Sequence, residues 1–380
     1  MQKKGLAVIL IALVYLFATL PGFSQKRPPG KYKKIQKYLD KATGDKLAGV
    51  VVYIRSAKHG EWTATSGYAN LAEKQPLRKD HIFSMASIGK MYNAVAVLKL
   101  AEEGKINLDD KIANYLSIEI INNLPHAGDV TLRHLLGHTS GFVNYEKDPE
   151  LVRCYTSGQL KLDTLSHLDV LRRYVFGKPA SFHPGQKYDY SSTNYLLLAM
   201  IVDKVTPEGH SEYLRTLIDQ HGFLNTYYRQ TPPQKNVNYY GDLNQDGVVE
   251  DLTAQTFETT NWFIGDDGVY APIEEAAHFL QALMKGQILS QQSLSEMQTW
   301  DNDKKPNYGL GLMADRSFPY GLLMGHSGRG IGTTTDLYYF PKRDMTVAIF
   351  CNTGLRGAAR DFSHTYYKMR TRIVKKLFLF

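Results

Sequence analysis

Strand-forming segments lie near both ends of this chain, and their placement constrains the fold more than any other feature. Apolar alternation or a continuous apolar run predicts strands at Gly49–Ile54, Glu61–Tyr68, Gly309–Met313, Gly321–Gly325, Thr333–Phe340 and Met345–Cys351. Residues from about 117 to 300 are mostly helical segments and polar loops. We therefore expect an α+β fold, an α/β sandwich. One antiparallel sheet is built from both ends of the chain, is flanked by helices and carries an inserted, mainly helical domain.

The expected domain limits follow from this pattern. Residues 25–104 and 301–380 form the sheet domain, and residues 105–300 form the inserted helical domain. At the N-terminus, Lys3 and Lys4 precede an apolar run and then small residues, which is typical of a secretory signal peptide over residues 1–24. We expect cleavage after Ser24 and a periplasmic or secreted protein. An uncleaved N-terminal anchor is the alternative, and it also leaves the domain outside the cytoplasm.

Charge and composition narrow the range of partners. The formal net charge is +8, and much of the basic excess lies near the two ends of the chain. Solvated helix faces explain such clusters, and attraction to an anionic cell-envelope surface is the alternative. No stretch of the sequence resembles a nucleic-acid-binding module, and the expected export also argues against that partner. The apolar end Leu377–Phe380 permits peripheral membrane contact at most.

The chain has two cysteines, Cys154 and Cys351, so it is not a disulfide scaffold. Cys351 ends the apolar run of a predicted strand, and we expect it to be a buried thiol. A bridge between Cys154 and Cys351 is the alternative in an oxidising compartment.

Ser87 and Lys90 are the first candidates for chemistry. Ser87 lies where a polar loop joins a predicted helix that runs to Gly104, so unpaired amides and the positive end of the helix dipole surround it. Lys90 follows one turn later on the same face. A desolvated lysine there can take the hydroxyl proton and make the serine a nucleophile. Ser-x-x-Lys is common by chance, and a capping serine beside a solvated lysine is the alternative.

Two later stretches add further candidates. Tyr190 precedes the apolar helix Leu196–Val202, and a tyrosine in this place can act as a general base or proton shuttle if a cation lowers its pKa. A packed tyrosine that bonds to the backbone is the alternative. The stretch Gly325–Gly330 ends a predicted strand, where glycines allow close approach and edge amides can bind an oxyanion.

Two motif-like patterns fail on inspection. The sequence around Ser327 nearly matches a nucleophile elbow, but Arg329 replaces the last glycine and a strand follows where a helix is required. His134 and His138 have the i, i+4 spacing of zinc ligands. The intervening glutamate is missing and Gly137 breaks the helix, so we expect no metal there.

A calcium loop is the third pattern. The segment Asp242–Gly247 resembles the front half of an EF-hand loop, but its twelfth position is Thr253 rather than Glu. A hairpin turn at Asp246–Gly247 is favoured, and calcium binding by this segment is the alternative.

Taken together, three ordered motifs resemble the serine β-lactamase-like family. That family includes class C β-lactamases, D-alanyl-D-alanine carboxypeptidases, related esterases and D-aminopeptidases. The motifs are Ser87-x-x-Lys90, Tyr190-Ser191-Ser192 and His326-Ser327-Gly328. Further family-like stretches are Leu135–Gly141, Pro184–Gly185, Gly265–Phe279 and Tyr308–Leu312, so the resemblance covers nearly all of the chain from Gly49 to Gly354.

The resemblance implies a β-lactamase/transpeptidase-like fold with the site between the sheet and the helical domain. It also implies an acyl-enzyme mechanism that needs no cofactor. Ser87 attacks a carbonyl, Lys90 and Tyr190 share the proton transfers, and the amides of Ser87 and Arg329 form the oxyanion hole. Which of Lys90 and Tyr190 takes the first proton stays open. The substrate-binding residues implied are Ser192, His326, Ser327 and Gly328.

Two departures from the family pattern concern the substrate. Ser192 stands where asparagine is commoner, and His326 stands where the β-lactamases usually have a lysine that helps hold the substrate carboxylate. The resemblance therefore implies a peptidase, esterase or amidase acting on a small molecule or peptide, with D-amino-acid and peptidoglycan-derived peptides among the candidates, rather than an efficient β-lactamase. A catalytically silent relative that binds cell-wall peptide or a protein partner is the alternative.

Overall fold

The computed structural model describes residues 30–58, 60–156, 165–300 and 307–378. The predicted signal peptide at residues 1–24 lies outside these ranges. Among the helices of the described residues, none combines the length and the apolar character that crossing a membrane requires.

The first and last strands of the chain meet in the middle of one sheet. β1 (Gly49–Ser56) pairs antiparallel with β13 (Met345–Cys351), with Val50 opposite Cys351. The sheet has eight strands in the order β3-β2-β1-β13-β12-β11-β10-β9. Its other strands are β2 (Gly60–Asn70), β3 (Gln75–Pro76), β9 (Asn307–Tyr308), β10 (Met313–Asp315), β11 (Leu323–Arg329) and β12 (Thr334–Phe340). The predicted α+β fold is confirmed, with an antiparallel sheet built from both ends of the chain.

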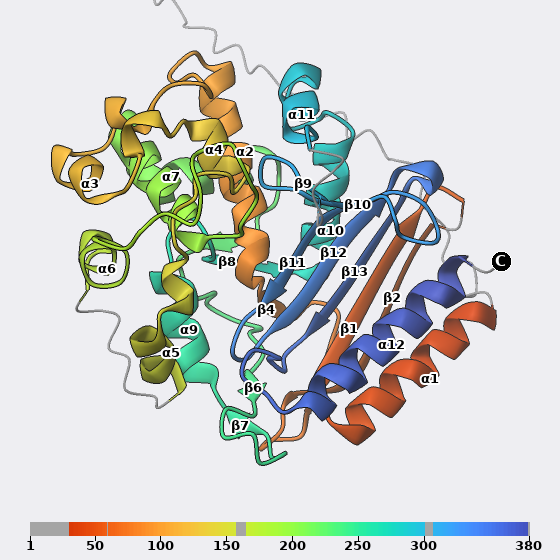
Figure 1. Cartoon of the computed structure of the whole chain (residues 1–380). Coiled ribbons are helices and arrows are strands. Elements are labelled where there is room, and N and C mark those ends of the chain that lie inside the picture. Colours follow the sequence, from red (N-terminus) through yellow and green to blue (C-terminus); the bar gives the residue numbers. More distant parts are fainter. Residues whose placement is uncertain (1–29, 59, 157–164, 301–306, 379–380) are drawn as a thin grey trace, which may run out of the picture.

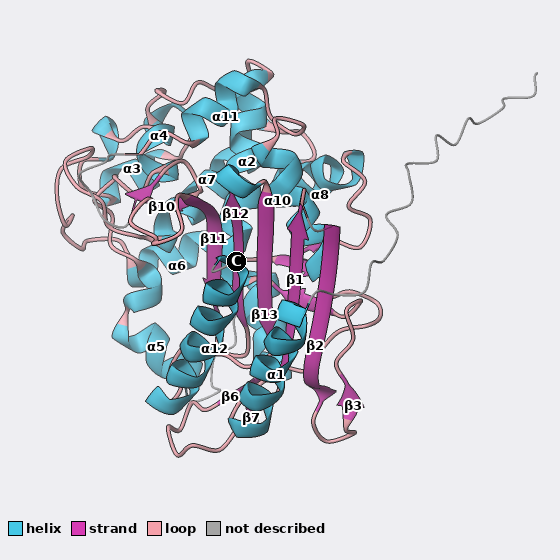
Figure 2. Ribbon diagram, turned by 90° about the vertical axis from the view of Figure 1, so that its right-hand side faces the viewer, coloured by secondary structure: helices cyan, strands magenta, loops and turns pink. Residues whose placement is uncertain are grey.

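Helices cover both faces of the sheet because strand residues alternate between two cores. The even-numbered residues of β1 face α1 (Gly30–Asp45) and α12 (Arg360–Phe378), which lie side by side in Figures 1 and 2. Residues 51 and 53 point the other way. They join the larger core with α2 (Gly89–Glu102) and α10 (Ile273–Met284).

Most of the helical segments between β4 (Ile82–Ser84) and β9 lie together beside the sheet (Figure 1). The helices are α3 (Ile118–Asn123), α4 (Leu132–Leu136), α5 (Pro149–Thr156), α6 (His167–Tyr174), α7 (Ser192–Val205), α8 (Gly209–Gln220), α9 (Thr253–Trp262) and α11 (Gln291–Met297). β4 also pairs with β8 (Val269–Pro272), and β8 with β5 (Tyr227–Tyr228). α10 differs because it packs on β1, β12 and β13. The predicted limits of the inserted domain, residues 105–300, stay a prediction.

Two predicted strands differ from the structure. The prediction at Gly309–Met313 is wrong, because β9 ends before this segment and β10 begins only at its last residue. Gly311 has a φ of +78°, and this left-handed turn interrupts what the apolar alternation suggests is one strand. The prediction at Gly321–Gly325 covers only the start of β11, which pairs with β12 as far as Arg329. The His326-Ser327-Gly328 motif therefore lies inside a strand.

The segment with calcium-like spacing joins β6 (Tyr240–Gly241) to β7 (Glu250–Asp251), which pair antiparallel. The two carboxylate oxygens of Asp242 accept hydrogen bonds from the amides of residues 246, 247 and 359. Asp242 thus holds the loop against the start of α12. Cys351 is a buried thiol of β13 and is not bonded to Cys154.

Candidate active site

Ser87 lies in the single turn η1 (Ala86–Ile88), which leads directly into α2. The turn is tied to the sheet, since the carbonyl of Met85 accepts a hydrogen bond from Thr335 Oγ1 of β12 at 2.9 Å. Ala86 has a φ of +47°, an unfavourable conformation for a residue with a side chain. Such strain next to a candidate nucleophile is typical of functional sites, where the surrounding structure holds it in place.

Lys90 is fully buried beside Ser87. Its Nζ donates to Ser87 Oγ at 3.3 Å and to the backbone carbonyl of Asp266 at 3.1 Å, and it lies 3.8 Å from Asp266 Oδ2. Gly89 allows this approach, because a Cβ there would lie 2.7 Å from the carbonyl oxygen of Asp267. The structure thus brings the predicted serine and lysine together, in a site from which water is largely excluded.

Tyr190 completes the predicted trio. Its ring centroid lies 5.1 Å from Lys90 Nζ. Burial raises the pKa of the Tyr190 phenol well above its ordinary value, a hydrogen bond with Ser87 lowers it, and the charges of nearby carboxylates raise it further. The phenol is therefore held in its protonated form. This favours a proton donor or shuttle over the phenolate base considered from the sequence.

The register of β11 orients the Arg329 amide that the sequence assigns to the oxyanion hole. The amide of Gly330 donates to Thr333 O at 2.9 Å, so the amide of its neighbour Arg329 points away from β12. On that side β10 pairs with β11 only over residues 323–325, and η1 packs against the rest of the strand. A Cβ on Gly328 would lie 2.3 Å from Met85 O, so only glycine permits this contact. The amide of Arg329 is thus directed to the edge that Ser87 occupies.

The side chain of Arg329 lies elsewhere. Its guanidinium donates to Asp336 Oδ1 at 2.8 Å and lies over the rings of Tyr366 and Tyr367 of α12, on the other face of the sheet. Ser327 shares that face by strand alternation, and its Oγ contacts Met313 Sδ at 3.7 Å. The side chains of Ser327 and Arg329 therefore do not line the site with Ser87.

His326 is on the Ser87 side of β11 but is fully buried. Its Nε2 is 3.0 Å from the hydroxyl of Tyr308, and its Nδ1 is 2.8 Å from the carbonyl of Ser327. Burial lowers the pKa of His326 to about 3, and the charge of Lys90 contributes. The imidazole is therefore neutral. It packs against Tyr308 and the backbone of β11, and it presents no cation to a substrate.

Three carboxylates beside Lys90 were not predicted from the sequence. Burial raises the pKa of Asp266 to about 7 against the opposing charge of Lys90, and burial together with the charge of Asp266 raises the pKa of Asp267 to about 8. Glu146 is the third: burial acts to raise its pKa, but the charges of Arg356 and Lys90 bring it below its ordinary value. Arg356 NH1 lies 3.4 Å from Glu146 Oε2. We call Glu146, Asp266 and Asp267 the acidic triplet.

Ser192, the third residue of the second motif, lies next to this triplet. It is fully buried, its amide donates to Asn144 Oδ1 at 3.2 Å, and its hydroxyl has no hydrogen-bond partner among the described residues. The adjacent acids in the sequence Gly265-Asp266-Asp267-Gly268 are the only sequence signal that points to this feature.

The histidines with zinc-like spacing have structural contacts. His138 Nδ1 accepts the amide of Ser191 at 3.2 Å, and its ring lies 4.3 Å from that of Tyr190, centroid to centroid. His134 Nδ1 accepts the amide of Thr131 at 3.2 Å in a helix cap. His138 therefore positions the loop that carries Tyr190.

The sequence profile described as "Beta-lactamase" matches residues 35–367, which is most of the chain. The chain belongs to the beta-lactamase family. Members of this family are serine hydrolases. Penicillin-binding protein 4* of Bacillus subtilis (strain 168) is 26% identical over 310 residues, which cover 75% of this chain and 64% of the relative. The chain therefore spans less than two thirds of that relative's length.

Solved structures of other proteins share the fold. A D-stereospecific amidohydrolase from Streptomyces sp. superposes with a TM-score of 0.76 at 24% identity, covering 90% of this chain and 97% of that one. The D-amino acid amidase from Ochrobactrum anthropi SV3, complexed with D-phenylalanine, has a TM-score of 0.76 at 23% identity and covers 91% and 98%. At this identity the likeness shows the β-lactamase/transpeptidase-like fold, as the sequence motifs imply.

Proposed function

We propose that this beta-lactamase-family chain hydrolyses an amide through an acyl-enzyme, and that its substrate is a D-amino-acid amide or short peptide with a free ammonium group. The observation that carries the proposal is the acidic triplet beside Ser87 and Lys90. The names of the amidohydrolase and the amidase with the same fold support a substrate of this class.

The charges at the site favour an ammonium over a carboxylate. The acidic triplet faces two nearby cations, Lys90 and Arg356, and Asp266 and Asp267, with pKa values of about 7 and about 8, ionise only as pH rises through the neutral range. The position where the β-lactamases usually carry a lysine holds the neutral, buried His326, and the Arg329 guanidinium is engaged by Asp336 on the other face. A substrate carboxylate thus meets no cation at either position, whereas a substrate ammonium would face the acidic triplet and would itself favour the ionised forms of Asp266 and Asp267.

The proposed reaction has two steps. In the first, Ser87 Oγ attacks the carbonyl carbon while the Lys90 amine takes the hydroxyl proton, and the amides of Ser87 and Arg329 hold the oxyanion. The C–N bond breaks, and Tyr190 delivers a proton to the leaving amine as it is replenished from Lys90. In the second, water attacks the ester and gives a proton back through the same groups, which releases the acid and restores Ser87.

Substrate comparison tests the proposal. We expect hydrolysis of D-phenylalanine amide, with kcat/KM at least about a hundredfold lower for N-acetyl-D-phenylalanine amide, which cannot form the ammonium contacts. Ser87→Ala serves as the inactive control. Equal rates for the free and acetylated amides would overturn the role of the triplet. Turnover of a penicillin or of a simple ester in preference to both amides would overturn the substrate class.

The place of action is a second part of the proposal. The lysines, apolar run and small residues over 1–24 favour export to the periplasm or the medium. N-terminal sequencing of the protein recovered from the cell envelope and the medium tests it, with Gln25 expected as the first residue. Recovery of an intact N-terminus in the cytoplasm would contradict it.

A further inference from the structure

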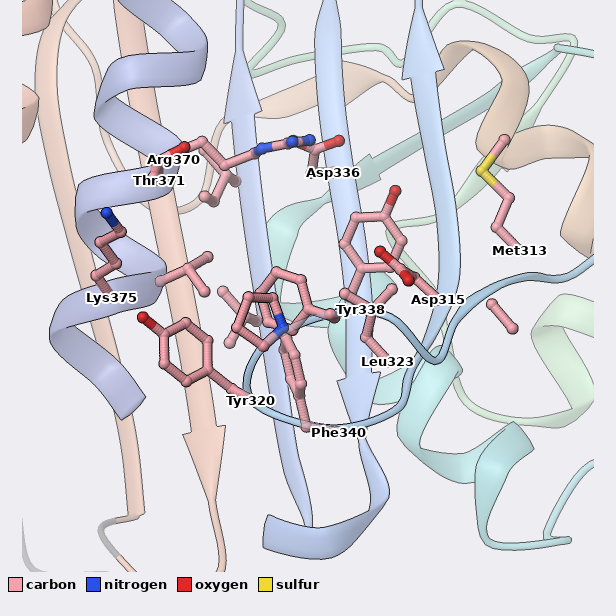
Figure 3. Close-up of a pocket in the computed structure, with 16 residues that line it drawn as sticks. Met313, Asp315, Tyr320, Leu323, Asp336, Tyr338, Phe340, Arg370, Thr371 and Lys375 are labelled. Atoms are coloured by element: carbon pink, nitrogen blue, oxygen red, sulfur yellow. The ribbon is translucent and has the colours of Figure 1, made fainter. Parts of the chain in front are cut away.

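A cavity of about 380 Å³ lies on the face of the sheet that points away from Ser87 (Figure 3). Its floor is formed by strands β10 to β13, one wall by α12 and the other by the loop around Phe318 and Tyr320. The geometry of the sheet accounts for the space. Eight strands about 4.8 Å apart span roughly 34 Å, whereas two helices each about 10 Å across cover roughly 20 Å. The strands that extend beyond α12 are therefore covered by this loop instead of by a helix.

The body of the cavity is apolar and aromatic. Leu323, Phe340 and Val347 form part of the floor, and Tyr320 and Val374 come from the two walls. This size and lining match those of small-molecule sites, which enclose about 300–1,000 Å³ and carry few polar groups.

The polar end of the cavity carries an excess of positive charge. The Asp336 carboxylate is almost fully buried and is shared by two guanidiniums, with Arg329 at 2.8 Å and Arg370 at 3.3 Å. The hydroxyl of Tyr366 also donates to it at 2.8 Å. Lys375 lines the wall beyond Arg370 on the same helix (Figure 3). On the opposite wall, the Asp315 carboxylate accepts the amide and hydroxyl of Ser317. One carboxylate between two guanidiniums leaves Arg370 with charge to offer a ligand.

We propose that this cavity is a second binding site, separate from the hydrolytic one, for an amphipathic monoanion: an apolar chain or ring that carries one carboxylate. The apolar body occupies the space between α12 and β10–β13. The carboxylate pairs with Arg370 and faces Lys375. A cationic amphipath of the same size binds more weakly, because its charged group would be repelled by Arg370 and Lys375 at this end of the cavity.

Titration calorimetry of the purified full chain with decanoate tests the proposal, with decylamine as the cationic and decanol as the neutral counterpart. We expect one saturable decanoate site, weaker decylamine binding at that site, and decanol binding weaker by about tenfold or more. The readout does not use hydrolysis, so its failure is distinct from failure of the proposed function.

Matched variants locate the site. Arg370→Gln is expected to weaken decanoate by about tenfold or more while leaving decanol unchanged. Val374→Trp fills the cavity and is expected to abolish both. Arg372→Gln is the control, since this exposed arginine of α12 lies over Tyr38 and does not line the cavity. If Arg370→Gln fails to fold, two measurements still test the site. One is the loss of decanoate binding in Val374→Trp, and the other is protection of the amides of residues 316–322 from hydrogen exchange by decanoate. Decylamine binding with the affinity of decanoate, or decanoate binding that Val374→Trp leaves unchanged, would overturn the proposal.

Discussion

Lys90 and Asp266 form a buried pair in which the amine lies 3.1 Å from the backbone carbonyl and 3.8 Å from the carboxylate of the same residue. Asp266 thereby fixes the amine at 3.3 Å from Ser87 Oγ. An amine held in this way loses little freedom when it takes the serine proton, which is the structural basis for assigning it that role.

Replacing the amine tests this role. Lys90→Met is expected to lower the rate of Ser87 acylation by at least about a thousandfold. The variant should still fold at pH 6, because the Lys90 charge lowers the pKa of Asp266 and its loss leaves the buried carboxyl neutral. Stopped-flow or quench measurement of the acylation rate tests this prediction, and circular dichroism checks that the variant is folded. Acylation within tenfold of the wild type would exclude Lys90 as the base.

The Tyr190 hydroxyl is expected to act on the leaving group. Tyr190→Phe should lower kcat for an amide by about 10²- to 10⁴-fold with little change in KM, and should affect an ester with a good leaving group much less. Tyr188→Phe is the matched control and should stay within about threefold. Equal losses for amide and ester substrates would show that Tyr190 acts elsewhere in the cycle.

The raised pKa values of Asp266 and Asp267 predict how stability depends on pH. Asp266 and Asp267 have folded pKa values of about 7 and about 8, above the ordinary value of 3.8, so the folded chain binds more protons than the unfolded chain between these limits. The contribution of these two carboxyls to the free energy of unfolding should therefore fall as pH rises from about 4 to about 8.

Asp267→Asn should reduce this fall, with little effect at pH 4 and a gain in stability at pH 8. Urea unfolding at both pH values measures it, with Asp219→Asn on the exposed side of α8 as the control. A variant that is destabilised equally at both pH values would show that Asp267 is charged throughout.

Contact between β11 and η1 predicts a steric effect. Gly328→Ala places a Cβ 2.3 Å from Met85 O, a backbone atom that cannot move alone, so the strand and the Ser87 turn must separate. Labelling of Ser87 should slow by about a hundredfold or more. Gly128→Ala, where a Cβ meets nothing within 4 Å, is the control. Wild-type labelling of Gly328→Ala would argue against β11 as part of the oxyanion hole.

The sequence predicts the sheet well because its strands carry their signal locally. The apolar runs at β1, β12 and β13 mark the strands within a few residues. Because these strands come from both ends of the chain, one antiparallel sheet is the arrangement that pairs them. The segment Tyr308–Met313 misleads for a physical reason: it alternates like a strand, but Gly311 turns at positive φ against Ala94 and Tyr195. Alternation records which residues are apolar and does not record φ.

The site residues also fall into two groups: those that local sequence brings together and those that only the tertiary fold brings together. Ser87 and Lys90 are close in sequence, so helical spacing alone brings them together. Glu146 and Asp266 are far apart along the chain, and their approach to Lys90 follows only from the tertiary fold. The burial of a side chain also follows only from the tertiary fold. The sequence places His326 in a substrate-binding motif, but only the structure shows Tyr308 closing over it.

Intact-mass analysis after treatment with a fluorophosphonate tests the central claim most directly. The account predicts one covalent adduct that peptide mapping assigns to Ser87, that Ser87→Ala loses, and that Ser295→Ala on α11 retains. An adduct that persists in Ser87→Ala, one that maps to Ser327, or no adduct on the folded wild-type chain would contradict it.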